Sequence, residues 1–210
     1  DGMKVLAIGR IGVFNATGRY QLYIDHLEPD GVGALYQRYE QLKKQLTEEG
    51  FFHFDPKPIP RFPKNIAVIT SPSGAVIRDI ITTVKRRYPI VQLTLYPTAV
   101  QGKHAADELV KNLERVSAHG DYDTVIIGRG GGSIEDLWPF NEEKVVRAVR
   151  KMDIPIISSV GHETDTTLVD FASDQRAATP TAAAEIATPV LSEELIRIQE
   201  LQARLYRAQV

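Results

Sequence analysis

The sequence contains no cysteine in its 210 residues. Disulfide bonds and zinc sites built on thiolates are therefore excluded. The chain also has no apolar run of about 18 residues, the length that a membrane-spanning helix needs. No basic segment followed by an apolar segment marks a signal peptide. Together these absences predict a cytoplasmic protein.

The sequence also has little net charge, but its charges are unevenly distributed. The formal net charge is −2. Residues 56–90 carry seven basic side chains and one acidic one, whereas residues 160–210 carry four basic and eight acidic ones. Such asymmetry suits a polyanion bound on one side of the molecule. Alternatively, Lys85, Arg86 and Arg87 are a solvated helix end, where cations favour the helix dipole.

The pattern of residues divides the chain into four parts. Residues 1–30 alternate apolar and polar side chains around the turn sequence Asn15-Ala16-Thr17-Gly18, which predicts a hairpin. Because a lone hairpin is marginally stable in water, we expect it to end a larger β domain. Residues 31–63 predict a helix that ends at Gly50, followed by a stiff proline-rich linker.

Residues 64–190 predict an α/β domain. Buried strands are expected at residues 66–70, 91–96, 124–127 and 154–160, each followed by an amphipathic helix. This alternation predicts a parallel, Rossmann-like sheet with right-handed crossovers and helices on both faces. A short helix over 177–185 follows, with Thr179 as N-cap and Pro180 as its first residue.

Residues 191–210 show a heptad pattern. Apolar residues stand at a and d positions, which predicts the start of a coiled coil that continues beyond Val210.

A glycine-rich stretch follows the predicted strand 124–127. Arg129 is followed by Gly130, Gly131, Gly132 and Ser133, and then by the acidic pair Glu135 and Asp136. A nearly bare backbone lets its N–H groups approach an oxyanion while a cation stands beside them. The alternative is a flexible turn with a solvated arginine.

The other predicted strands end in similar loops, and in an open parallel sheet these loops meet at one edge. Hydroxyl-bearing and glycine-rich loops that enter helices bind phosphate oxygens through free N–H groups. The candidate phosphate- or DNA-binding residues are Ser71, Ser73, Gly74, Arg78, Gly130, Gly131, Gly132 and Ser133.

His162 and Asp165 follow the last predicted strand, three residues apart. A histidine oriented by a carboxylate is a general acid or base near neutral pH. Alternatively, His162, Asp165 and Asp79 hold a divalent ion, or Asp165 is an N-cap beside a structural histidine.

Four segments give the chain a resemblance to the large subunit of exodeoxyribonuclease VII. They are Ile66-Ala-Val-Ile-Thr-Ser-Pro-Ser-Gly-Ala75 with Arg78-Asp79, Gly128-Arg-Gly-Gly-Gly-Ser-Ile-Glu-Asp-Leu137, Val160-Gly-His-Glu-Thr-Asp165 and Arg176-Ala-Ala-Thr-Pro-Thr-Ala-Ala-Ala-Glu185. The resemblance implies that residues 1–30 end an OB-fold. It also implies that the C-terminal coiled coil, largely missing from this chain, binds several copies of a small subunit.

The resemblance also implies an activity and a site. The family degrades single-stranded DNA from both ends to oligonucleotides. Its catalytic residues correspond to Asp79, Arg129, His162 and Asp165. It does not strictly require a metal, so Mg²⁺ is an optional ion with Asp79 and Asp165 as possible ligands. From the residues alone, a nucleotide- or dinucleotide-binding enzyme and a non-catalytic subunit that binds single-stranded DNA remain alternatives.

Overall fold

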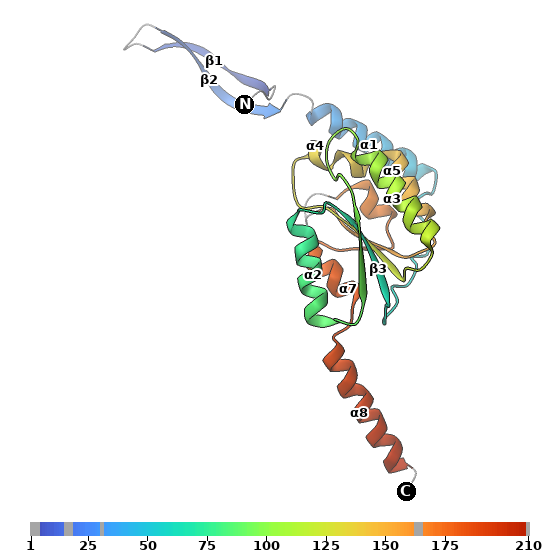
Figure 1. Ribbon diagram of the computed structural model, residues 1–210. Coiled ribbons are helices and arrows are strands. Elements are labelled where there is room, and N and C mark those ends of the chain that lie inside the picture. The colour runs from blue at the N-terminus through green and yellow to red at the C-terminus, as the bar shows by residue number, and fades with distance from the viewer. Residues whose placement is uncertain (1–4, 15–18, 30–31, 162–165, 209–210) are drawn as a thin grey trace. The chain divides into compact units, whose positions relative to one another are not determined.

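A computed structural model describes residues 5–14, 19–29, 32–161 and 166–208 (Figure 1). The chain divides into two compact units, Asp1–Leu42 and Lys43–Val210. No helix in the described ranges combines the length and the apolar character that a membrane span needs.

The first unit contains the predicted hairpin. Strands β1 (Val5–Phe14) and β2 (Arg19–Pro29) pair antiparallel, with a register shift between Ile8 and Gly9. Apolar side chains of both strands, such as Ile11 and Leu22, are exposed. The hairpin is confirmed, and its assignment to an OB-fold remains a prediction.

Helix α1 (Val32–Glu48) begins in the first unit and ends in the second. It ends as predicted, because Gly50 has a positive φ of 71°. The Gly50 amide donates to the Thr47 carbonyl at 3.0 Å and the Phe51 amide to the Leu46 carbonyl at 2.9 Å. This pair of bonds is a Schellman motif, which satisfies carbonyls that the helix end leaves free.

The second unit is built on a five-stranded parallel sheet with the order β4-β3-β5-β6-β7. In chain order, the first four strands of this sheet are β3 (Asn65–Thr70), β4 (Gln92–Pro97), β5 (Thr124–Gly128) and β6 (Ile156–Ser159). The parallel α/β fold is therefore confirmed, although β6 is shorter than the predicted 154–160. The fifth strand, β7 (Gln175–Arg176), was not predicted, because two residues show no periodicity.

Helices cover both faces of the sheet, as predicted. Helices α2 (Ala75–Arg87) and α7 (Pro180–Ala187) contact each other on one face. Helices α3 (Ala105–His119) and α5 (Glu143–Lys151) contact each other on the opposite face.

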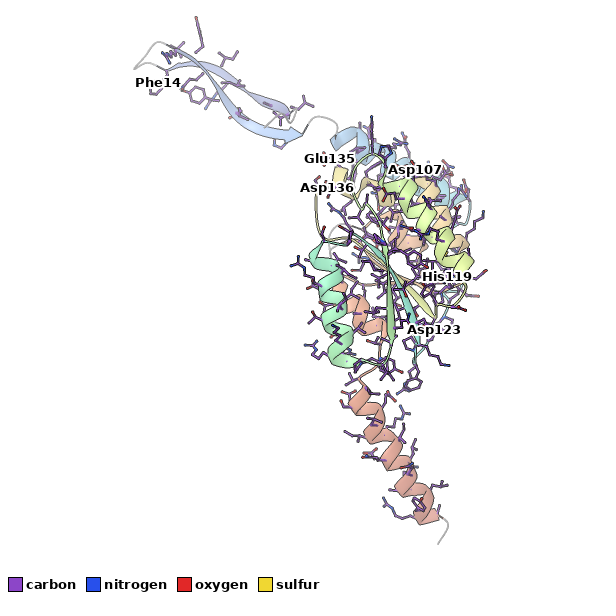
Figure 2. The ribbon with its side chains drawn as sticks, viewed as in Figure 1. Phe14, Asp107, His119, Asp123, Glu135 and Asp136 are labelled. Carbon is purple, nitrogen blue, oxygen red and sulfur yellow. The ribbon has the colours of Figure 1, made fainter. Side chains whose placement is uncertain are left out.

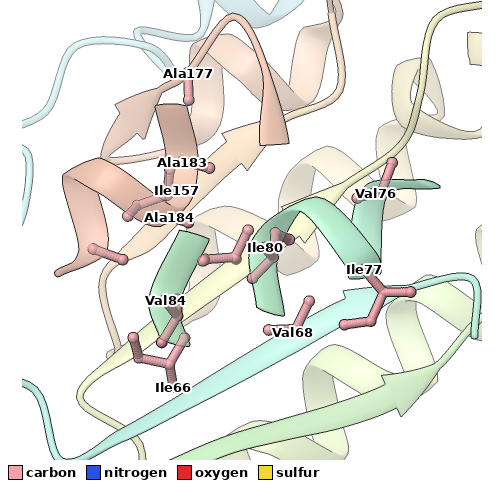
Figure 3. Close-up of a cluster of buried hydrophobic side chains, with 12 residues drawn as sticks. Ile66, Val68, Val76, Ile77, Ile80, Val84, Ile157, Ala177, Ala183 and Ala184 are labelled. Atoms are coloured by element: carbon pink, nitrogen blue, oxygen red, sulfur yellow. The ribbon is translucent and has the colours of Figure 1, made fainter. Parts of the chain in front are cut away.

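The core between α2, α7 and the sheet consists of branched side chains facing alanines (Figure 3). Ile66 and Val68 point from β3 to this face because side chains along a strand alternate. Ala183 and Ala184 of α7 are fully buried, and their small size lets the helix approach α2 closely. Burial of each Ile or Val side chain stabilises the folded state by about 1.5–3 kcal/mol relative to leaving it exposed.

The stretch that follows the glycine loop is helical, which the sequence pattern did not predict. Helix α4 (Ile134–Leu137) runs directly into a 3-10 turn, η1 (Trp138–Asn141). Asn141 then accepts the Leu168 amide at 2.8 Å, at the start of α6 (Leu168–Ala172). This stretch thus connects the glycine loop to the folded core.

The proline-rich segment after α1 has no regular structure, as expected, and it is anchored to the sheet. Asp174, a buried residue next to β7, accepts the Lys57 amide at 2.8 Å and lies 3.0 Å from Lys57 Nζ. Its other carboxylate oxygen accepts the Ile156 amide at 2.9 Å. One carboxylate therefore joins three segments that are distant in sequence.

The chain ends in helix α8 (Leu191–Ala208), which has no buried residue. Its heptad residues Leu195, Ile198 and Leu205 are exposed. The helix is confirmed, and its pairing in a coiled coil remains a prediction.

Candidate active site

The candidate site lies where the chain reverses its direction across the sheet. From β3 the chain crosses to β4 on one side, and from β4 it returns to β5 on the other side of β3. Ligands of open α/β sheets bind at such a switch point, outside the carboxyl ends of the strands. The loops after β3 and β5, residues 71–74 and 129–133, are therefore neighbours at this edge.

The two ends of the sheet are distinct in Figure 2. Glu135 and Asp136, which follow the glycine loop, lie at one end of the domain, and Asp123, which precedes β5, lies at the other. The predicted loops after the strands therefore belong to the end that carries Asp136.

Arg129 is buried at the centre of this edge. Its side chain is 6% exposed. Its amide donates to the Ser159 carbonyl at 3.0 Å, which fixes the backbone between β5 and β6. Nη2 donates to Gln101 Oε1 at 3.1 Å and lies 3.3 Å from Asp136 Oδ2. Within the described residues Nη1 has no hydrogen-bond partner.

One cavity, of about 340 Å³, lies between Arg129 and the first turns of α2 and α7. We call it the Asp79 cavity. Its lining residues are Ala75, Val76, Asp79, Arg129, Gly130, Ser159, Val160, Ala178, Thr179, Pro180 and Thr181. The structure thus brings two predicted site residues, Asp79 of α2 and Arg129 of the glycine-rich loop, to one cavity.

Arg129 also lines a second cavity, of about 410 Å³. We call it the Ser71 cavity. Its lining residues are Thr70, Ser71, Gly74, Ala75, Val76, Ala99, Val100, Gln101, Arg129, Gly130 and Gly131. The two cavities share Ala75, Val76, Arg129 and Gly130, so both adjoin the start of α2 and the glycine-rich loop.

The remaining predicted residues lie in other places. Ser73 and Arg78 are exposed and line neither cavity. Ser133 is the N-cap residue of α4, and Gly132 lies against the Arg129 side chain. His162 and Asp165 lie outside the described residues.

The structure adds site residues that the sequence analysis did not select. Ser159 ends β6, Gln101 follows β4, and Thr179 and Thr181 begin α7. A signal for Thr181 was present, since Thr179-Pro180 marks a helix start. Its position at the site depends on β7, which brings residues 177–179 to the same edge of the sheet.

Asp79 is the one residue with a carboxylate among the described lining residues of the Asp79 cavity, and it could serve as a ligand of a divalent ion. Within the described ranges no three histidine or acidic side chains gather as a metal site. Mg²⁺ is often held by one or two carboxylates together with substrate phosphates. Asp79 fits that role.

Comparison with known proteins identifies the family. The family model described as "Exonuclease VII, large subunit" matches residues 51–210. The chain belongs to the exonuclease VII large subunit family. The matched residues contain the whole five-stranded sheet and both cavities around Arg129.

Relatives of this family are similar over nearly all of this chain. This chain is 65% identical over 208 residues to the exodeoxyribonuclease 7 large subunit of Latilactobacillus sakei. The matched region covers 99% of this chain and 46% of that protein. It is 64% identical over 205 residues to the protein of the same name from Enterococcus faecalis, covering 98% of this chain and 46% of that protein. The chain thus spans about half the length of these curated relatives.

Proposed function

We propose that this chain contains the catalytic domain of an enzyme that hydrolyses phosphodiester bonds of single-stranded DNA from both ends to give oligonucleotides. The observation that carries the proposal is the buried Arg129 guanidinium. It lines a cavity with Asp79 and has one nitrogen without a partner in the described part of the chain. A buried cation with unused donors is suited to an anionic group such as a phosphate.

The reaction follows from the chemistry of these groups. A water oxygen attacks phosphorus in line, the opposite P–O ester bond breaks, and the departing oxygen takes up a proton. Arg129 stabilises the charge that develops on the phosphoryl oxygens, and the backbone amides of Gly130–Gly132 assist it. Asp79 positions the water or the substrate.

Proton transfer is assigned to His162, either as base for the water or as acid for the departing oxygen. Asp165 orients the imidazole. These two roles rest on the resemblance of the sequence to the family. Mg²⁺ is optional in this proposal, and when bound beside Asp79 and Asp165 it would supply additional charge stabilisation.

The proposal includes partners. Several copies of the small subunit bind through the C-terminal coiled coil, which α8 begins. The exposed apolar residues of α8 support this assignment, because an isolated helix gains nothing by exposing them. With cellular DNA as substrate, we place the enzyme in the cytoplasm.

The test uses the full-length large subunit assembled with its small subunit. Degradation of end-labelled single-stranded DNA is measured with Mg²⁺ and with excess EDTA, for the wild type and for His162→Ala. Cleavage that survives EDTA but is lost in the variant supports catalysis by His162 without a required metal. Cleavage lost in EDTA would assign Asp79, His162 and Asp165 to metal binding, and full activity of the variant would remove His162 from the mechanism.

A further inference from the structure

One wall of the Asp79 cavity has no role in the proposed chemistry. It is formed by the start of α7, residues 178–181. Pro180 has no N–H, and the Ala182 amide donates to Thr179 Oγ1 at 3.1 Å. The Ala183 amide donates to the Thr179 carbonyl at 3.0 Å. The Thr181 amide is the remaining N–H group in the first turn of α7, and it has no acceptor among the described residues.

Ser159 adds a second donor to the same cavity. It is 2% exposed, and its Oγ has no hydrogen-bond partner within the described residues. Its carbonyl already accepts the Arg129 amide, so the backbone holds Ser159 and Arg129 together. An unpaired buried hydroxyl destabilises a protein, and a bound ligand that accepts its hydrogen bond removes that cost.

Three residues that carry hydrogen-bond donors, Arg129, Ser159 and Thr181, therefore line one cavity. Within the described residues, Arg129 Nη1 and the Ser159 hydroxyl have no partner. The positive end of the α7 dipole adds to the attraction for an anion. A phosphate group presents several oxygens and can accept from all of them at once.

We propose that Ser159 and Thr181, with Arg129, form a subsite that binds one phosphate group of single-stranded DNA. This inference rests on the proposed function and adds two positioning residues to it. Ser159 and Thr181 contribute neutral, fixed donors that contact the phosphate before the reaction begins. They stabilise the bound substrate and the transition state equally, so their loss raises KM and leaves kcat nearly unchanged.

The experiment compares Thr181→Val and Ser159→Ala with wild type in the full-length large subunit assembled with its small subunit. The substrate is an end-labelled oligothymidylate. We expect KM to rise about tenfold in each variant, the size typical of a lost hydrogen bond to a charged group, with kcat within about twofold. Thr181→Ser keeps the amide and hydroxyl and restores the wild-type KM. The matched controls are Thr82→Val and Ser117→Ala, exposed on α2 and α3 and outside both cavities.

Inorganic phosphate is the second probe. Its inhibition constant should rise in Thr181→Val by about the same factor as KM. A raised KM with an unchanged inhibition constant would overturn the subsite, because the lost contact would then be to base or sugar. Wild-type kinetics of both variants would overturn it as well, as would a fall in kcat at constant KM.

Failure of this inference can be distinguished from failure of the proposed function. If the wild type degrades the oligonucleotide and Arg129→Ala does not, the proposed function stands whatever the Thr181 result. If the wild type does not degrade it, the proposed function fails. Calorimetric titration of inorganic phosphate into the wild type and Thr181→Val then tests the subsite alone, and equal affinities would overturn it.

Discussion

The guanidinium group of Arg129 lies directly against the Cα atom of Gly132. A Cβ atom at position 132 would fall 2.6 Å from Arg129 Nη2 and 2.8 Å from Cζ, and closer still to Nη1. Such separations are too short for non-bonded atoms, so the arginine and an alanine at position 132 cannot both keep these positions. Gly132 thus belongs to the site because the absence of a side chain there leaves room for the Arg129 guanidinium group.

Gly132→Ala is expected to lower kcat by more than about tenfold, because misplaced catalytic groups lose rate steeply. The melting temperature should change little, since the side chain of Arg129 can shift where the backbone cannot. Single-turnover cleavage of labelled single-stranded DNA and thermal melting measure the two effects.

Gly33→Ala is the matched control for this prediction. A Cβ atom at Gly33 meets nothing within 4 Å. The control should retain wild-type cleavage. A Gly132→Ala enzyme as active as the control would show that the position of the Arg129 guanidinium does not matter to the reaction.

Arg129→Lys should be a poor enzyme although it keeps the charge. A guanidinium group can hold Gln101 and Asp136 through Nη2 and still direct Nη1 to a phosphate, whereas an ammonium group has a single nitrogen. We expect kcat to fall about 100-fold or more, the loss typical of one removed oxyanion donor. Rates near those of the wild type would refute the role assigned to the planar group.

Asp174 should matter to stability. Asp174→Ala removes the acceptor of the Lys57 and Ile156 amides and leaves Lys57 Nζ without its carboxylate. The expected loss is about 3 kcal/mol of unfolding free energy, because buried donors are left unsatisfied. Urea denaturation measures it, with Asp153→Ala, at an exposed position, as control. Equal midpoints for the two variants would contradict the anchoring role of Asp174.

The raised pKa of Tyr96 predicts that the folded protein loses stability at alkaline pH. Burial, and then its hydrogen bond to the Tyr122 hydroxyl at 3.0 Å, raises the pKa of Tyr96 from 10.0 to about 12. Between these two values the folded state holds a proton that the unfolded state has lost. The stabilisation is therefore fully present below pH 10 and is lost as pH rises through about 12.

Absorbance of tyrosinate during an alkaline titration, together with unfolding measured at each pH, checks this expectation. Tyr96→Phe should remove the late-titrating tyrosine and flatten the fall in stability over that range. A variant whose stability falls as steeply as that of the wild type would assign the alkaline transition to other groups.

The sheet could be predicted from sequence because its strands have a strong local signal. The run 124–127 is entirely β-branched and is followed by Gly128, and four of the five residues 66–70 are β-branched. Helix α7 was also predictable, since Thr179 and Pro180 mark its start. In contrast, β7 could not be found, because a two-residue strand is defined only by its partner β6.

The composition of the cavities was less predictable than the fold. Asp79 and Arg129 were predicted as site residues although they are 50 residues apart, and the structure places both at one cavity. Ser159 was missed because a serine inside a buried strand resembles any core serine in sequence. Its place at the site depends on the register between β5 and β6, which pairs Gly128 with Ser159.

The most direct test of the account is cleavage of end-labelled single-stranded DNA by the assembled full-length enzyme carrying Arg129→Ala, with binding followed by fluorescence anisotropy. If the cavity beside Arg129 is the site of hydrolysis, the variant binds the strand through its remaining contacts but leaves it uncut. A variant that cuts single-stranded DNA at the wild-type rate would place the chemistry elsewhere in the protein.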